Sequence, residues 1–473
     1  MKKLLVILFA LGLVFSFTAP VMATDVSFDG TYRVRGFYDS NSALTKDAAA
    51  HATTPKAYYD QRFRLNTVFQ VAEGLKVVVR FDALEGTWGT SALRNPSVAA
   101  GNTTSRDAIL GTTPASSQSQ ANLQFDKAYV SFVTGIGLFE AGYNSWGVWG
   151  TGFGDEESFV GQIGYKVPVG DNLVFLLKTA KVVEGDTNTS YADYDDDKYV
   201  AAAVYFNDTV QAGFLYTYYR YENFAHTNVA SYLLSTPPGT YFDTVNMSAV
   251  NPYVKLTLGD LYIESELLWV DGKAKNTTGS DVDLEGLTFY LMGKYNLGPI
   301  YLGALFAYVQ GDDPTTNNNV KLENALSLAN SGADWDPCLI LFSDTCTTSL
   351  GQNGAASIYD TSNTCMTGTS MTNGFLYQVF AGAAFDKLSM KASLTFAEAH
   401  EDTYYTANTP ASKYLSKDYG TEFDITASYK LYDNLTYTVG AGYLWAGDYY
   451  KGSSEANEID DTYLLMNKLQ VTF

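Results

Sequence analysis

The chain has 473 residues, of which 17% are charged and 15% aromatic, and its formal net charge is -21. The length alone suggests two or three soluble domains, although large all-β domains and barrels exceed the usual domain size. The 36 tyrosines and 40 glycines argue against an ordinary soluble enzyme, because tyrosine suits places where an apolar ring meets water, such as the two interfaces of a membrane, and strands favour aromatic residues.

The amino terminus has the pattern of a secretory signal peptide. Lys2 and Lys3 precede an apolar run, "LLVILFALGLVFSF", and the small residues of "VMA" stand before the expected cleavage point. We therefore expect residues 1–23 to be removed and residues 24–473 to form the mature domain. An uncleaved membrane anchor is the alternative, and the flanking residues favour a signal.

No later segment approaches the ~18 uninterrupted apolar residues of a membrane helix. A mature chain that spans a membrane therefore has to be a barrel, because only helices and closed barrels satisfy their backbone hydrogen bonds in lipid.

Segments of alternating apolar and polar residues recur along the mature chain. From Leu388 to Phe396 the alternation has no exception, and from Glu422 to Leu431 one face is apolar and the other polar. A single such segment also fits a half-buried strand of a soluble sandwich, but the pattern repeats about eighteen times. In chain order the expected strands lie near 25–38, 57–72, 75–88, 122–134, 138–149, 158–168, 173–183, 198–206, 209–221, 248–258, 261–271, 284–296, 300–311, 373–385, 388–399, 420–432, 435–447 and 462–473.

The connections between these strands alternate strictly between short and long. Short turns such as "EG" at 73 and "DN" at 433 alternate with long polar stretches, the longest being 312–372. This is the arrangement of bacterial outer-membrane barrels, which have tight periplasmic turns and longer extracellular loops. The sequence therefore predicts an all-β, transmembrane, antiparallel up-and-down β-barrel. Several middle segments alternate poorly, so the expected number of strands is sixteen to eighteen.

The signal, the opening strand "VSFDGTYRVRGFYDS" and the last strand "TYLLMNKLQVTF", ending in Phe473, resemble those of Gram-negative outer-membrane porins, the superfamily of trimeric general and substrate-specific porins. The resemblance implies a homotrimer in the outer membrane, in contact with the lipid bilayer and lipopolysaccharide. It implies that Phe473 is the signal read by the outer-membrane assembly machinery. Small hydrophilic solutes are the expected partners, with no cofactor, metal or nucleic acid.

Five of the eight arginines fall between residues 33 and 80, and they form a candidate pore-lining basic cluster. The apolar residues beside them occupy the opposite face, so we expect the arginines to face the lumen. Counting from the periplasmic ends places Arg33 level with Arg64, and Arg35 level with Arg62. Like charges on neighbouring strands repel unless carboxylates or water screen them. The five residues, called the arginine cluster below, are Arg33, Arg35, Arg62, Arg64 and Arg80.

Two interpretations of the arginine cluster stay open. In the first, the arginines only link neighbouring strands of the wall by pairing with the inward acids Asp29, Asp60 and Asp82. Alternatively, the resemblance implies an eyelet in which acids of the third extracellular loop, here "SWGVWGTGFGDEES", fold inward and face the basic wall. The candidate constriction-loop acids are Asp155, Glu156 and Glu157. Loops 89–121 and 312–372 are the alternative constrictions.

Other candidate chemistry is sparse. His51, His226 and His400 fall in expected loops, and no serine-histidine or metal-ligand spacing surrounds them, so no enzymatic activity is expected. Of the remaining inward-facing residues, lysines outnumber acids, the acids being Glu264, Glu266, Glu422 and Asp424.

Three loop features have two interpretations each. Two of Cys338, Cys346 and Cys365, all in the longest loop, can form a disulfide in an oxidising compartment, but the pairing is open. The acidic run at 193–198 is either a divalent-cation site beside lipopolysaccharide or, more commonly, a solvated charge run. The tyrosines between 216 and 221 form either an aromatic girdle, which is favoured, or a sugar-stacking track.

The sequence leaves three functions. The first is a porin whose water-filled channel passes ions and small hydrophilic solutes by diffusion. The second is a channel selective for small anions or carboxylates, with the arginines as a binding ladder. The third is a barrel plugged by its long loops that serves as a scaffold or adhesin.

Overall fold

The computed structural model describes most of residues 24–473. The described residues are 25–41, 44, 46, 55–88, 123–155, 157–184, 195–222, 244–275, 281–311, 313, 321–323, 335–343, 371–406, 409–452 and 454–473. The expected signal, residues 1–23, lies outside them.

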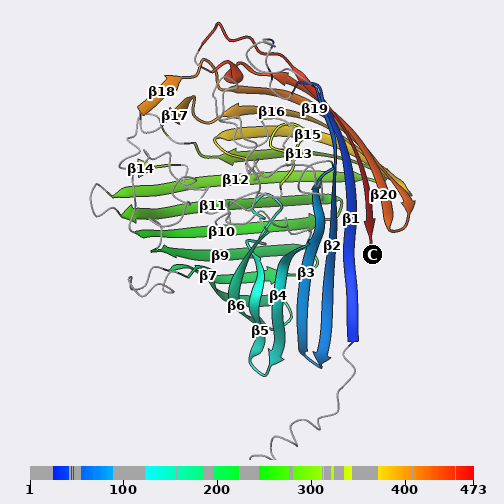
Figure 1. Ribbon diagram of the computed structural model, residues 1–473, viewed down its shortest axis with the longest axis vertical. Coiled ribbons are helices and arrows are strands. Elements are labelled where there is room, and N and C mark those ends of the chain that lie inside the picture. The colour runs from blue at the N-terminus through cyan, green and yellow to red at the C-terminus, as the bar shows by residue number, and fades with distance from the viewer. Residues whose placement is uncertain are drawn as a thin grey trace, which may run out of the picture.

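The described chain forms a closed antiparallel barrel of eighteen strands, as the sequence predicts (Figure 1). Consecutive barrel strands are neighbours throughout, joined alternately by short turns and longer loops. The barrel strands are β1 (Asp25–Asp39), β2 (Lys56–Ala72), β3 (Leu75–Thr87), β4 (Leu123–Thr134), β5 (Gly137–Trp146), β6 (Ser158–Val169), β7 (Leu173–Val183), β8 (Asp196–Phe206), β9 (Val210–Tyr221), β10 (Thr244–Leu258), β11 (Leu261–Lys275), β12 (Val282–Leu297), β13 (Ile300–Val309), β15 (Gly374–Phe385), β16 (Leu388–Ala399), β19 (Asp418–Tyr432), β20 (Leu435–Ala446) and β21 (Thr462–Thr472).

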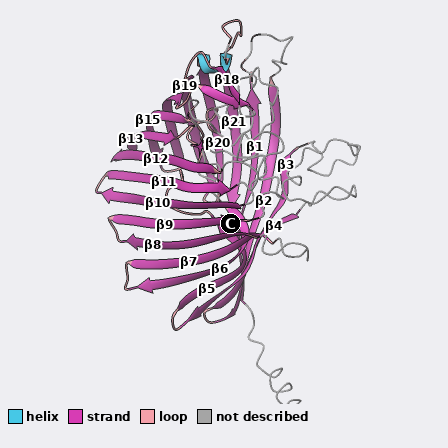
Figure 2. Ribbon diagram, turned by 90° about the vertical axis from the view of Figure 1, so that its left-hand side faces the viewer, coloured by secondary structure: helices cyan, strands magenta, loops and turns pink. Residues whose placement is uncertain are grey.

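The first and last strands close the barrel. β1 pairs with β2 on one side and with β21 on the other, and Figure 2 shows β1 and β21 side by side in the same wall. Beyond the end of β21, Gly30 and Phe473 exchange two backbone hydrogen bonds, of 2.8 and 3.1 Å. Closure leaves no edge strand in the described barrel wall, so each of its eighteen strands has a backbone partner on each side.

The distribution of side chains between the two faces is inverted relative to a soluble protein. In β19 the apolar residues Phe423 and Ile425 are 42% and 49% exposed, whereas Glu422 and Asp424 between and beside them are 0% and 4% exposed. Exposed apolar residues of this kind recur on strands all round the barrel. An apolar outer face with polar residues inside is the pattern of a barrel surrounded by lipid.

Most predicted boundaries agree with the structure within a few residues, and eighteen strands settle the count. The poorly alternating segments near 138, 173 and 198 are the regular strands β5, β7 and β8, although β5 ends at Trp146, three residues early.

Four short elements besides the eighteen barrel strands escape the sequence analysis. They are β14 (Lys321–Leu322), which pairs with β12, the hairpin of β17 (Thr403–Thr406) and β18 (Thr409–Lys413), and the 3-10 helix η3 (Asp448–Lys451). Within the described residues, no helix has the length and apolar character needed to cross a membrane.

Two loop segments fold into the interior and add to the buried core. Segment 147–155 follows β5, and segment 335–343 is a described middle part of the longest loop. Phe153 of the first segment packs edge-on against Trp335 of the second, with ring centroids 5.0 Å apart. The two segments therefore meet inside the barrel.

Candidate functional site

The arginine cluster lies on one wall made by β1, β2 and β3, on the face opposite the exposed Phe28 and Tyr32. This confirms the inward orientation. The predicted heights are wrong by two residues, because Arg33 pairs with Arg62 and Arg64 pairs with Thr31. The cause is an overhang, since Asp25, the first residue of β1, pairs with Gln70 and β2 runs two residues further to Ala72.

Two arginines stitch neighbouring strands, as one interpretation predicts. Arg35 makes a two-pronged contact with Asp60, at 2.8 and 3.1 Å. Arg64 donates two hydrogen bonds of 2.7 Å to Asp82, which is 5% exposed. Asp29 departs from the prediction, because its carboxylate accepts a hydrogen bond from Asn66 at 2.9 Å.

Glu157 of the third extracellular loop reaches the basic wall, as the eyelet interpretation predicts. Its two carboxylate oxygens accept hydrogen bonds of 2.9 and 2.7 Å from Arg80, and Lys127 of β4 lies 2.8 Å away. Burial alone raises the pKa of Glu157, but the hydrogen bonds and charges of Arg80 and Lys127 outweigh it and lower this pKa to about 2. Glu157 is therefore ionised at neutral pH.

The contact of Glu157 with the arginines changes the expected electrostatics. An eyelet acid that faces a basic wall across water creates a transverse field, whereas an acid in contact neutralises its partners. Arg64, Arg80 and Lys127 are matched by three carboxylates within 4 Å, those of Asp82, Asp126 and Glu157. This part of the cluster is therefore close to neutral.

The other two candidate loop acids behave differently. The Asp155 carboxylate accepts a hydrogen bond from the backbone N–H of Trp149 at 3.2 Å, which closes the loop on itself. Glu156 lies outside the described residues.

Arg62 has no acidic partner among the residues that the structure describes. It forms no ion pair with any residue that the structure describes, and its buried Nε has no hydrogen-bond partner there. Among the arginines of this wall, Arg62 is therefore a clear candidate to act on a passing anion.

Below Arg64 and Arg80, towards the short-turn end of the barrel, an open cavity of about 410 Å³ adjoins the wall. Four of its lining residues are basic, namely Arg64, Lys76, Arg80 and Lys127, and Asp29 and Asn66 also line it. The cavity leads from the carboxyl-terminal seam to the arginine wall, because Thr472 and Phe473 also line it.

A wall glutamate whose role the sequence does not reveal anchors the third loop. Glu266 of β11 is 2% exposed. It accepts hydrogen bonds of 2.6 Å from both the backbone N–H and the hydroxyl of Thr151, and one of 3.0 Å from Asn251. The glycines of "GTGFG" permit this approach, because a Cβ on Gly150 or Gly154 would lie 2.5 or 2.0 Å from a Glu266 oxygen.

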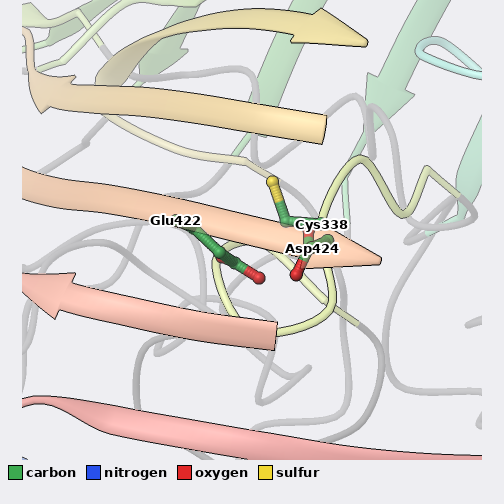
Figure 3. Close-up of side chains that lie close together, drawn as sticks. All are labelled: Cys338, Glu422 and Asp424. Carbon is green, nitrogen blue, oxygen red and sulfur yellow. The ribbon is translucent and has the colours of Figure 1, made fainter. Parts of the chain in front are cut away.

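Segment 335–343 is anchored by a second wall glutamate on β19. The fully buried Glu422 accepts hydrogen bonds from three consecutive backbone N–H groups, those of Leu339, Ile340 and Leu341, at 3.0, 2.8 and 2.7 Å. Asp424 and Cys338 lie beside it, as Figure 3 shows. Ligand atoms of Cys338, Glu422 and Asp424 lie within 4.8 Å of one another, but N–H donors that point at Glu422 suit an anion and disfavour a cation.

Of the cysteines and histidines, the structure describes Cys338 and His400. Cys338 is free and buried, with its thiol 3.4 Å from the Thr395 hydroxyl. His400 follows β16. Its Nδ1 accepts a hydrogen bond of 3.2 Å from the backbone N–H of Gly311, and its Nε2 shares a hydrogen bond of 3.3 Å with the hydroxyl of Tyr308. The remaining predicted residues, His51, His226, Cys346 and Cys365, lie outside the described residues, as does loop 89–121.

Two expectations need correction. Asp195, Asp196 and Asp197 are 7%, 3% and 7% exposed, and Asp195 and Asp197 both bind Lys181, so this acidic run is not a solvated one. The tyrosines of β9 divide between the two faces. Tyr216 is 38% exposed on the outside, as a girdle predicts, whereas Tyr219 is buried inside.

Comparison with known proteins gives matches to solved structures alone. No family model matches the chain, and no curated protein matches it. A BenF-like porin from Pseudomonas fluorescens Pf-5 is 13% identical, with a TM-score of 0.48 over 95% of this chain and 99% of that one. OccAB2 from Acinetobacter baumannii is 10% identical, with a TM-score of 0.48 over 94% and 98%. OpdK from Pseudomonas aeruginosa, solved with vanillate, is 11% identical, with a TM-score of 0.45 over 94% and 99%. The first of these is named a porin.

Proposed function

We propose that this protein is an outer-membrane channel that passes small hydrophilic solutes by diffusion through a lumen narrowed by two inward loops. The observation that carries the proposal is the inverted distribution of side chains in a closed barrel of eighteen strands. The apolar outside suits lipid, and a barrel of this size leaves an aqueous interior. The proposal assigns the chain no catalytic reaction.

The proposal also covers export and assembly of the chain. Residues 1–23 act as a cleaved signal, Phe473 is read by the assembly machinery, and three mature chains associate in the membrane beside lipopolysaccharide. Amino-terminal sequencing that finds Met1 on the membrane-bound protein would refute signal cleavage. A strictly monomeric species in mild detergent would refute the trimer.

A planar-bilayer recording of the purified protein tests the channel. We expect discrete conductance steps that scale with salt concentration. A folded barrel that inserts but carries no current would favour the alternative function, a plugged scaffold or adhesin.

A channel selective for small anions is the second candidate function, and Arg62 favours it. Arg62 forms no ion pair with any residue that the structure describes, and charged walls at close range select ions of opposite sign. Conductance that saturates with one organic anion, and that is blocked competitively by a second, would identify it.

A further inference from the structure

We infer that Glu266 and Glu422 are positioning residues that hold the two inward loops together as one septum across the lumen. The inference rests on the proposed channel only where it concerns current, because the anchoring itself is a property of the fold. The septum comprises segments 147–155 and 335–343, and the two glutamates stand on β11 and β19, in different parts of the wall.

Each glutamate side chain accepts hydrogen bonds from backbone N–H groups of an inward loop. In the part of the barrel that the structure describes, Glu266 accepts bonds from Thr151, and the backbone N–H of Gly154 also points at it. Glu422 accepts three consecutive N–H groups with both of its oxygens. A run of N–H groups converging on a carboxylate makes an anion-binding nest, here occupied by the wall's own side chain. A carboxyl group offers two acceptor oxygens for these bonds, and a carboxamide has only one.

The two loops also depend on each other. Phe153 and Trp335 are 3% and 7% exposed. Both rings contact Tyr290 of β12, with centroids 5.1 and 5.9 Å away, in addition to their own contact. Since each ring buries the other, release of one loop removes packing from the second. The two loops therefore form one septum, with two anchors and one shared aromatic contact.

Hydrogen exchange of the full-length barrel tests the anchors without reference to current. Glu422→Gln should accelerate exchange at Leu339, Ile340 and Leu341 by about tenfold or more, the ratio expected when these hydrogen bonds are weakened. Glu266→Gln should do the same at Thr151 and Gly154. The matched control is Glu140→Gln, because Glu140 of β5 is another glutamate of the wall but its carboxylate pairs with Lys166 of β6, at 3.1 Å. Unchanged exchange in Glu422→Gln and Glu266→Gln would overturn the inference.

A second variant tests the Glu266 anchor even if Glu266→Gln does not fold. Gly154→Ala leaves the wall intact but places a methyl group where the Glu266 carboxylate stands. It should accelerate exchange at Thr151 as Glu266→Gln does. Normal exchange in a folded, heat-modifiable Gly154→Ala barrel would contradict the Glu266 anchor.

Trp335→Leu tests whether the loops form one septum. It should accelerate exchange in both segments, because it removes the aromatic contact between them. Acceleration confined to segment 335–343 would show two independent loops and overturn the shared septum.

Bilayer recordings connect the septum to the proposed channel. Glu422→Gln and Glu266→Gln should both raise open-channel conductance and current noise above those of Glu140→Gln. Faster exchange with unchanged conductance would overturn the septum's control of current. A silent wild type with conducting glutamine variants would support the septum and refute free diffusion through the wild-type protein.

Discussion

Arg62 and Arg64 lie two residues apart on one face of β2, yet their surroundings differ. Arg64 is bound to the buried Asp82, whereas Arg62 has no ion pair with a described residue. A paired charge contributes to stability, and its loss leaves the partner buried and unmatched. An unpaired charge in the lumen contributes mainly to the potential along the path.

Replacement of Arg62 and Arg64 by glutamine, one at a time, should therefore give different results. Arg64→Gln should lower the free energy of unfolding by about 1–3 kcal/mol, because Asp82 loses a charged donor. Arg62→Gln should leave stability nearly unchanged and shift ion selectivity towards cations. Thermal unfolding in detergent and reversal potentials under a salt gradient measure the two effects. Equal unfolding temperatures for the two variants would show that the Arg64 pair does not stabilise the wall.

Glu157 should make the third loop's attachment resistant to mild acid. Its pKa in the folded protein is lowered to about 2 from an ordinary value of 4.5. The stability that it contributes is therefore fully present above about pH 4.5 and is lost as the pH falls towards 2. The difference in unfolding temperature between wild type and Glu157→Gln should persist at pH 5 and vanish near pH 2. A difference that disappears already at pH 5 would contradict the low pKa.

At the scale of elements, period-two alternation predicts the strands well because lipid and water select opposite faces. The register between strands is harder to predict from the sequence. The two-residue overhang of β2 is the reason why the predicted heights of the arginines are wrong. The faces of Glu266 and Glu422 follow from alternation, but their roles do not, because a bond to loop backbone leaves no periodic signal. The glycines of "GTGFG" are a local hint, since they mark a close approach whose partner the sequence does not name.

A lysine on the lipid face of β16 should show how strongly the outer surface depends on lipid. Leu394 is 47% exposed near the middle of the strand, and Leu394→Lys should cost about 2–4 kcal/mol if it lies at the membrane midplane. Ser389→Lys is the matched control, because Ser389 faces the lumen on the same strand. Refolding into lipid vesicles, followed by heat modifiability, measures both. Equal losses for the two variants would argue against a lipid-facing β16.

At the scale of the whole molecule, the carboxyl terminus has a structural role in addition to its proposed recognition. Phe473 exchanges backbone hydrogen bonds with Gly30 and stacks on Phe63 of β2, with ring centroids 6.2 Å apart. The resemblance implies the assembly signal, but only the structure shows that the same residue secures the seam between β1 and β21.

Deletion of Phe473 should therefore slow refolding of the purified protein into lipid vesicles, where no assembly machinery is present. The expected cause is the loss of the two closing hydrogen bonds and the aromatic contact. Wild-type refolding rates for the deletion variant, together with poor assembly in cells, would show that Phe473 acts through recognition alone.

The seam also determines how the barrel responds to mechanical force. Every other pairing between its eighteen strands joins neighbours in the sequence, whereas β1 and β21 come from opposite ends of the chain. A pull on the carboxyl terminus loads this junction first, and after it parts, each remaining hairpin is held to the wall by one flank. Extraction from a membrane should therefore proceed as a ladder of discrete force peaks, one hairpin at a time, starting with β20 and β21.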